Sequence, residues 1–158
     1  MKRILFFQIC CLVLFNLLPQ EAFLQQSKFS RMAFGSCNRQ DAPQPLWKPI
    51  AADHPDLWVW MGDNIYGDSR IMDTLSAKYT LQNANPDYQV LKASAPLIGI
   101  WDDHDYGPND AGAAYIFKNE SRQIFKNYWA NPSYGEEGKG IYTKVGYSDV
   151  DFFLTPPP

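Results

Sequence analysis

Three short apolar segments of this chain each end in side chains that can bind metal ions, and they cover residues 31–36, 57–61 and 97–101. Cys37 follows the first segment, Asp63 and Tyr66 follow the second, and the run Asp102-Asp103-His104-Asp105 follows the third. In an open α/β sheet, ligands bind beyond the carboxyl ends of the strands. If the three segments are strands, their ends predict one convergent site of a metalloenzyme.

Asp63 and Tyr66 are the candidate ligands at the end of the second segment. Gly62 lets the backbone turn sharply, so the Asp63 carboxylate can project beyond the sheet and bridge two metal ions. A phenolate from Tyr66 is a hard ligand that suits a trivalent metal such as Fe(III). The alternatives are structural: Asp63 could cap a turn, and Tyr66 could be ordinary half-buried packing. The position directly after a buried strand favours metal binding.

The third cluster places three carboxylates around the imidazole of His104. Like charges this close are costly in a dry site unless a cation or a proton offsets them. His104 could bind a metal, or it could contact substrate while a neighbouring carboxylate orients it. The alternative is an exposed acidic turn with His104 at the surface, which the preceding apolar run disfavours. Arg39 could contact an anion, although a solvated side chain is the simpler role. His54 is expected at the surface or in a turn.

The N-terminus has the pattern of a secretory signal. Lys2 and Arg3 precede the apolar stretch 4–18, and residues 19–21 end it. This stretch is shorter than the roughly 20 apolar residues that span a bilayer. Residues 1–22 are therefore predicted to be a cleaved signal peptide of a secreted or periplasmic protein, with no stable membrane span. An uncleaved membrane anchor is the alternative.

Removal of residues 1–22 would leave Cys37 as the only cysteine of the chain. A lone cysteine forms no intramolecular disulfide, so an exported protein with a free thiol needs a reason to keep it. Cys37 could be a small buried hydrophobe, or its thiolate could bind a metal.

The composition is that of one globular domain, with 158 residues, 15% aromatic and 20% charged. The net charge of −3 and the absence of a basic run do not imply a nucleic-acid partner. An acidic protein that handles anions needs a local positive field, which a bound metal can supply. The sequence does not indicate an oligomeric state.

Strand-like and helix-like segments alternate along the chain. Strands are predicted at residues 29–34, 57–61 and 97–101, helices at 46–52, 71–81, 88–93 and 115–129, and a hairpin between 139–145 and 150–154. A break is predicted at Asn85-Pro86. This order favours an α/β layered fold.

Three ordered motifs resemble the metal-binding segments of the PhoD-like (alkaline phosphatase D) metallophosphatases, a branch of the calcineurin-like phosphoesterase superfamily: Phe34–Cys37, Met61–Tyr66 and Ile100–Asp105. Each motif is weak alone, but their combination and order are specific. The resemblance spans residues 29–154.

The resemblance implies a role for each candidate residue. Cys37, Asp63 and Tyr66 would bind iron, with Asp63 also bridging to a neighbouring metal, Asp103 would bind the second metal, and His104 would contact the phosphoryl group or the leaving oxygen. The implied cofactors are Fe(III) and Ca(II) in a binuclear or multinuclear centre. The implied activity is metal-assisted hydrolysis of small phosphate mono- or diesters.

The implied fold is a four-layer α/β/β/α sandwich, of which residues 29–158 would be the N-terminal part. Members of the family supply further His and Asp ligands from later strands, whereas no histidine follows His104 here. We therefore expect a truncated domain with incomplete activity in the isolated chain. The alternative is a non-catalytic remnant that binds metal or a partner.

Overall fold

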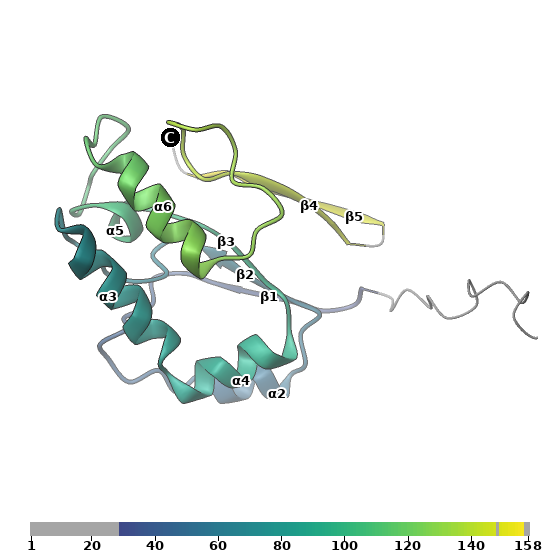
Figure 1. The fold of residues 1–158 in the computed structure, drawn as a ribbon. Helices are drawn as coiled ribbons and strands as arrows, with labels where there is room; N and C mark the ends of the chain where they lie inside the picture. The colour runs from purple at the N-terminus through teal and green to yellow at the C-terminus, as the bar shows by residue number, and fades with distance from the viewer. Residues whose placement is uncertain (1–28, 148, 157–158) are drawn as a thin grey trace, which may run out of the picture.

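The structure is a computed structural model that describes residues 29–147 and 149–156. The predicted signal peptide, residues 1–22, lies outside the described residues. Strands and helices alternate along the chain and end in a hairpin, as Figure 1 shows. The mixed α/β fold predicted from the sequence is therefore confirmed.

A three-stranded parallel sheet lies at the centre of the fold, in the order β1 (Met32–Gly35), β2 (Leu57–Met61) and β3 (Leu97–Ile100). The first four residues of β2 are buried, because this strand lies between the other two and both of its faces are covered. Met61 of β2 pairs with Ile100 of β3, and Gly35 of β1 pairs with Trp60 of β2. The three strands thus end at nearly the same level, and their carboxyl ends meet at one edge of the sheet.

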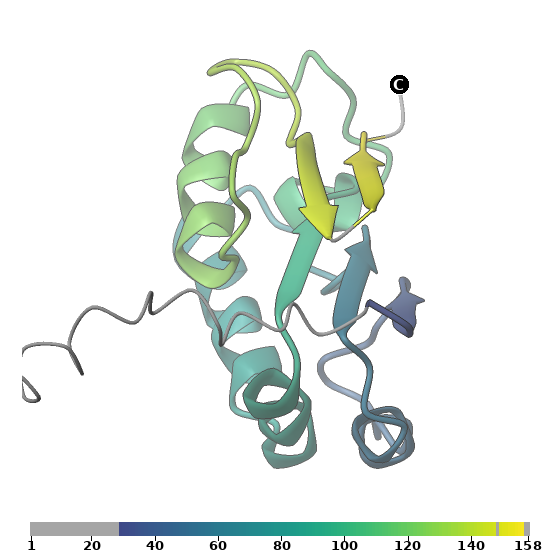
Figure 2. The ribbon, with the colours of Figure 1, turned by 90° about the vertical axis from the view of Figure 1, so that its right-hand side faces the viewer.

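Helices cover one face of the sheet (Figures 1 and 2): α2 (Trp47–Ala52), α3 (Met72–Asn83), α4 (Pro86–Ser94) and α6 (Lys118–Tyr128). Trp58 and Trp60, two residues apart on β2, both join the core on this face. Their indoles and that of Trp47 meet edge to face, with ring centroids 5.3 to 5.4 Å apart. This is a preferred geometry for aromatic pairs, so the cluster stabilises the docking of α2 on the sheet.

The predicted break at Asn85-Pro86 is where α4 begins. The Asn85 side chain accepts hydrogen bonds from the N–H groups of Asp87 and Tyr88, at 3.0 and 3.1 Å. Pro86 suits the first helical position because its missing N–H would have no partner there. The helix therefore starts at Pro86, two residues before the predicted start.

A separate antiparallel hairpin, β4 (Thr143–Tyr147) and β5 (Val150–Leu154), lies towards the other face of the sheet. Leu154 of β5 packs in a second cluster of buried residues with Leu57, Val59, Ile98 and Ile100. The prediction of a strand over residues 139–145 was wrong at its boundaries. Lys139 donates its backbone N–H to Glu136 in a turn, so β4 begins only at Thr143.

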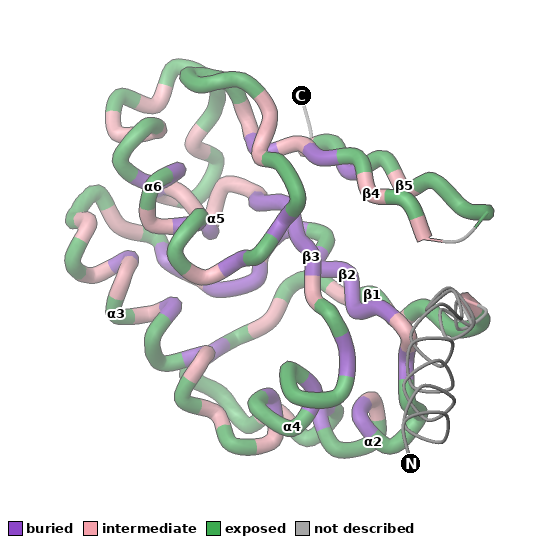
Figure 3. Tube along the Cα trace, turned by 45° about the vertical axis from the view of Figure 1, so that its right-hand side comes forward, coloured by how far each residue is buried: buried purple, intermediate pink, exposed green. Residues whose placement is uncertain are grey.

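The described residues contain these two sheets, one parallel and one antiparallel, and they do not show the complete four-layer sandwich. Figure 3 shows that buried positions concentrate on the central strands and on one side of each helix. Phe34, Met61 and Phe153 remain more than half exposed. No helix within the described part of the chain is long and apolar enough to cross a membrane.

Candidate metal centre

The three predicted ligand-bearing segments converge at the carboxyl edge of the parallel sheet. Cys37 lies two residues beyond β1, Asp63 two residues beyond β2, and Asp103 three residues beyond β3. The backbone N–H of Asn38 donates to the Asp63 carbonyl at 2.8 Å, which ties the first two loops together. Cys37 and Asp63 have φ angles of 55° and 49°, a left-handed conformation that is uncommon for residues other than glycine. Such strained positions cluster at functional sites.

Gly62 lets the second and third loops approach closely. Its φ is +94°, and a Cβ added there would lie 2.8 Å from the Asp102 Cβ. Any larger residue would both strain the backbone and push the loops apart. The glycine therefore sets the spacing between Asp63 and the Asp102–Asp105 run.

Asp63, Asp103 and His104 each offer a ligand atom within 4.8 Å of the others. The Cys37 Sγ lies 3.5 Å from Asp63 Oδ2. Asp63 Oδ1 is buried and has no hydrogen-bond partner in the described part of the chain. A buried carboxylate oxygen without a donor is costly, and a cation would satisfy it. The donor set of carboxylates, imidazole and thiol fits a transition metal.

Burial raises the pKa of the Asp63 carboxyl, and the neighbouring carboxylates of Asp102 and Asp103 add to the shift. His104 and the Cys37 thiol act in the opposite direction. A cation bound beside Asp63 would act in the same direction as His104 and favour the ionised form of the Asp63 carboxylate. The electrostatics of Asp63 therefore also fit a bound cation.

Tyr66 packs against His104 and lies near Cys37 and Asp63. Its ring centroid is 4.3 Å from that of His104, and the Arg39 guanidinium lies 5.2 Å from it. Burial, followed by the charges of Cys37 and Asp63, raises the pKa of the Tyr66 hydroxyl, while Arg39 opposes the shift. Tyr66 is thus a neutral phenol unless a cation stabilises its anion.

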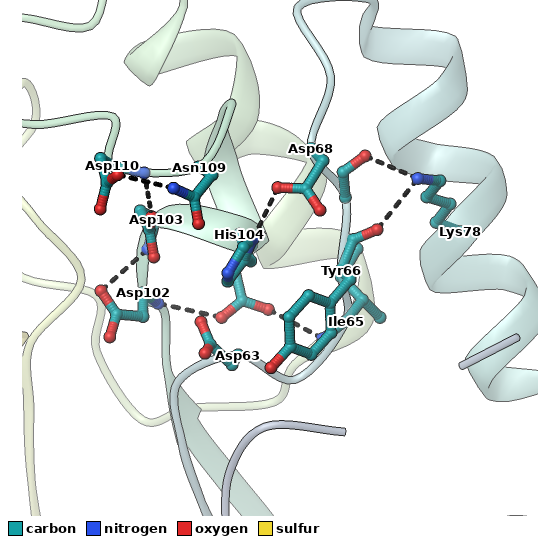
Figure 4. Close-up of polar contacts among 12 residues, drawn as sticks. Asp63, Ile65, Tyr66, Asp68, Lys78, Asp102, Asp103, His104, Asn109 and Asp110 are labelled. Carbon is teal, nitrogen blue, oxygen red and sulfur yellow. Dashed lines mark hydrogen bonds and ion pairs between the residues drawn. The ribbon is translucent and has the colours of Figure 1, made fainter. Parts of the chain in front are cut away.

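Backbone contacts hold the Tyr66 segment in place. The Gln40 side chain accepts from the Tyr66 N–H at 2.8 Å. The Lys78 ammonium of α3 donates to the carbonyls of Tyr66 and Gly67, at 3.0 and 2.9 Å (Figure 4). These contacts hold the backbone of the Tyr66 loop against the helical layer.

His104 is paired with a carboxylate that the sequence reasoning missed. Its Nδ1 lies 2.6 Å from Asp68 Oδ1, as the dashed line in Figure 4 marks. Burial acts to lower the pKa of His104, but the hydrogen bond and charge of Asp68, with the charges of Asp103 and Asp63, outweigh it and raise that pKa. With Nδ1 engaged, Nε2 is the ring nitrogen that remains for substrate or metal.

The short helix α5 (Asp103–Tyr106) carries both Asp103 and His104, and reciprocal hydrogen bonds cap it. Asp102 accepts from the Asp103 N–H at 2.8 Å, and Asp105 Oδ2 accepts from the Asp102 N–H at 2.9 Å. The fully buried Asp105 Oδ1 also accepts from the backbone N–H groups of Asn64 and Ile65, at 2.9 and 3.2 Å. Asp105 thus joins the ends of β2 and β3.

The structure brings all five predicted site residues together: Cys37, Asp63, Tyr66, Asp103 and His104. Cys37 is exposed, so the alternative of a buried hydrophobe is wrong. The His104 side chain is only 16% exposed, which is also unlike a surface residue. His54 is exposed, as predicted. The ligand and substrate roles of the five residues stay predictions.

Sequence reasoning missed the roles of Asp68 and Asp105. Asp68 is 36 positions from His104, and no local spacing connects the two. Its one sequence signal is its place just after Gly67, in the same loop as Tyr66. Asp105 was recognised as part of the acidic run, but nothing in the run distinguishes the buried carboxylate from the others.

No protein-family model matches the sequence, and no curated protein matches it. Among solved structures, one described as "Structure of PhoD" superposes on this chain with a TM-score of 0.66. The fold is PhoD-like. The match covers 77% of this chain and 30% of the PhoD chain, at 16% sequence identity. This chain therefore spans less than a third of that structure, and at such an identity the likeness concerns the fold alone. The structural match therefore confirms, for the fold, the resemblance to PhoD-like proteins that the three motifs indicate.

Proposed function

We propose that the described residues form part of a metal-dependent phosphoesterase centre that hydrolyses phosphate mono- or diesters. The observation that carries the proposal is Asp63: one of its oxygens is buried without a partner, the other lies 3.5 Å from a thiol, and Asp103 and His104 are within ligand reach. The PhoD-like fold supports the choice of a phosphoryl substrate over other uses of a metal.

The proposed ligands divide between two cations. Cys37, Asp63 and Tyr66 would hold iron, and Asp63 and Asp103 would hold a second cation such as calcium. When bound, such ions supply Lewis acidity and neutralise charge on the phosphoryl oxygens. The backbone N–H of Asp110 donates to Asp103 Oδ2 and so holds that carboxylate in place.

His104 is the proposed proton-handling group. Asp68 accepts from Nδ1, which fixes the ring and stabilises its protonated form. Nε2 then holds a proton that it can donate to a phosphoryl oxygen or to the leaving oxygen. Because the neighbouring carboxylates raise the pKa of His104, the ring stays protonated to a higher pH than an isolated histidine would.

The test measures metal binding and turnover separately. Calorimetric titration with calcium and with ferric iron should show binding to the chain, and Asp63→Asn should abolish it, since the amide cannot bridge as a carboxylate does. Glu137→Gln is the matched control, because it removes one charge from an exposed loop. Unchanged metal affinity in Asp63→Asn would refute the centre.

We expect the loaded 158-residue chain to hydrolyse a generic aryl phosphate at the background rate. Two-metal hydrolysis needs both cations at a fixed separation, and the close cluster in the described residues comprises only three ligand groups. An extended chain that carries the further strands of the proposed four-layer sandwich should be active. Robust turnover by the short chain, sensitive to a chelator, would show that overlooked ligands or a second chain complete the centre.

A metal-binding chain without catalysis is the second candidate. The three-residue cluster favours it, because a single cation needs no more than these groups and water. A secreted or periplasmic location, after cleavage of residues 1–22, is part of the main proposal. N-terminal sequencing of the exported protein tests the cleavage.

A further inference from the structure

A cavity of about 460 Å³ opens beside the candidate metal centre, on the side of β1 and α2. This volume lies within the range of sites that bind small molecules. Cys37 and Arg39 line the cavity and also border the metal centre. The cavity and the centre therefore adjoin one another.

The lining of the cavity is mainly apolar and aromatic. It includes the indoles of Trp47, Trp58 and Trp60, together with Phe34 and Leu46. Phe34 and Leu46 are 61% and 66% exposed, so apolar surface continues out to the mouth. A flat apolar group could stack against such a wall and bury surface on several sides.

One polar atom in this wall has no partner. The indole N–H of Trp60 donates to the Tyr88 hydroxyl at 3.0 Å, and that of Trp47 donates to the Gln44 side chain. The Trp58 N–H is buried and has no acceptor among the described residues, although Trp58 is only 3% exposed. A buried donor without a partner is costly, so the Trp58 indole is a point in this wall where the described residues leave a polar atom unsatisfied.

Two contacts connect the cavity to the chemistry. The Cys37 Sγ on its wall lies 3.5 Å from Asp63 Oδ2 in the centre. The Arg39 guanidinium lies over the Tyr66 ring, at the boundary between cavity and centre, and Asp41 pairs with it at 3.0 Å. A phosphoryl group at the centre would thus have an apolar cavity within reach on the side of Cys37.

We propose that this cavity, hereafter the tryptophan pocket, binds the aromatic alcohol part of a phosphate ester whose phosphoryl group sits at the metal centre. The inference rests on the proposed function and names its substrate class, an aryl phosphate ester. A second cavity, of about 500 Å³, borders Asp103 on the other side. Its lining includes the carboxylates of Asp102, Asp103 and Asp110, which suit it less well to an apolar group.

The test compares two phosphonates that share a headgroup and resist hydrolysis. Naphthylphosphonate carries the flat apolar group and methylphosphonate lacks it. Both are titrated into the full chain with excess calcium, and the indole N–H signals are followed by NMR. The Trp58 signal is assigned by its disappearance in Trp58→Phe. Burial of about 60 Å² of apolar surface at ~25 cal/mol/Å² corresponds to roughly tenfold tighter binding of naphthylphosphonate.

Ala42→Trp is the variant that fills the tryptophan pocket. Ala42 is an exposed loop residue on its lining, so the substitution should leave the fold intact. Ala77→Trp, on the exposed side of α3, is the matched control. We expect Ala42→Trp to remove the roughly tenfold preference for naphthylphosphonate and Ala77→Trp to keep it. We expect the Trp58 signal of the unmodified chain to shift with naphthylphosphonate only.

Asp63→Asn separates this inference from the proposed function. If the inference holds, Asp63→Asn weakens both phosphonates and Ala42→Trp weakens only naphthylphosphonate. Equal affinity of the two phosphonates, with no effect of Ala42→Trp, would overturn the tryptophan pocket while leaving the metal centre intact. Naphthylphosphonate binding that Ala42→Trp weakens and Asp63→Asn does not would also overturn the inference, because the pocket would then be independent of the centre.

Discussion

Asp105→Asn should destabilise the fold in a pH-dependent way. Asp105 is fully buried, and burial raises its pKa to about 7, although the N–H groups of Asp102, Asn64 and Ile65 act against the shift. Near pH 5 the wild-type side chain is then a neutral acid, close in shape to asparagine. The amide nitrogen that replaces Oδ2 cannot accept from the Asp102 N–H, so one donor is left unpaired. The expected loss in the free energy of unfolding is about 1–3 kcal/mol.

The difference between wild type and Asp105→Asn should shrink as the pH rises. The folded chain holds the Asp105 proton up to about pH 7, whereas the ordinary pKa of the group is 3.8. A group whose pKa is raised by folding contributes stability at low pH, and that stability is lost as the pH rises through the folded pKa. Between about pH 5 and pH 8 the wild type should lose up to roughly 3 kcal/mol from this group, and the variant should not.

The assay is urea unfolding followed by tryptophan fluorescence, at both pH values and with a chelator present. Glu137→Gln removes a carboxylate from an exposed loop, so its free energy of unfolding should equal that of the wild type at both pH values. A difference between wild type and Asp105→Asn that stays constant or widens with pH would refute the reasoning. It would show that the three N–H donors outweigh burial and keep Asp105 ionised throughout.

Three further predictions concern individual site residues. Ferric loading should give a visible phenolate-to-iron absorption that Tyr66→Phe removes; a band that persists in the variant would exclude Tyr66 as the ligand. Asp103→Ala should remove one metal equivalent in calorimetric titration, whereas His104→Ala should largely keep the metal, and equal losses would make His104 a ligand. Gly62→Ala should lower the free energy of urea unfolding by about 1–3 kcal/mol, because the φ of Gly62 is +94° and the new Cβ would lie 2.8 Å from the Asp102 Cβ. An unchanged free energy of unfolding would mean that the two loops can move apart without cost.

The parallel strands were predictable because their apolar runs are short, continuous and bounded by turn residues. Leu57–Met61 was predicted with its observed bounds, and the break at Asn85-Pro86 marked a real helix start. In the hairpin, β5 was predicted with its observed bounds, Val150–Leu154, whereas the bounds of β4 were not predicted. The positions of β4 are set by pairing with β5 and by the turn at Glu136–Lys139, and neither leaves a local pattern in the sequence.

The predictable part of the site is the part that follows directly from strand ends. Cys37, Asp63 and Asp103 come just after three parallel strands, so their convergence follows from topology alone. The remaining contacts depend on side-chain packing between distant segments. Asp68 meets His104, and Gln40 meets Tyr66, only because the loops fold over the sheet edge. No periodicity or spacing in the sequence indicates that these side chains form pairs.

The parallel order of the strands also has a consequence for folding kinetics. Cys37 and Asp63 are 26 residues apart, and Asp105 contacts Asn64 across 41 residues, so the contacts that join the three ligand-bearing loops are non-local. Loops of this length must close before the ligands meet, and such non-local contacts form slowly. A cation that binds only the assembled edge would then act late on the folding pathway. Added metal should slow the unfolding rate and leave the refolding rate almost unchanged.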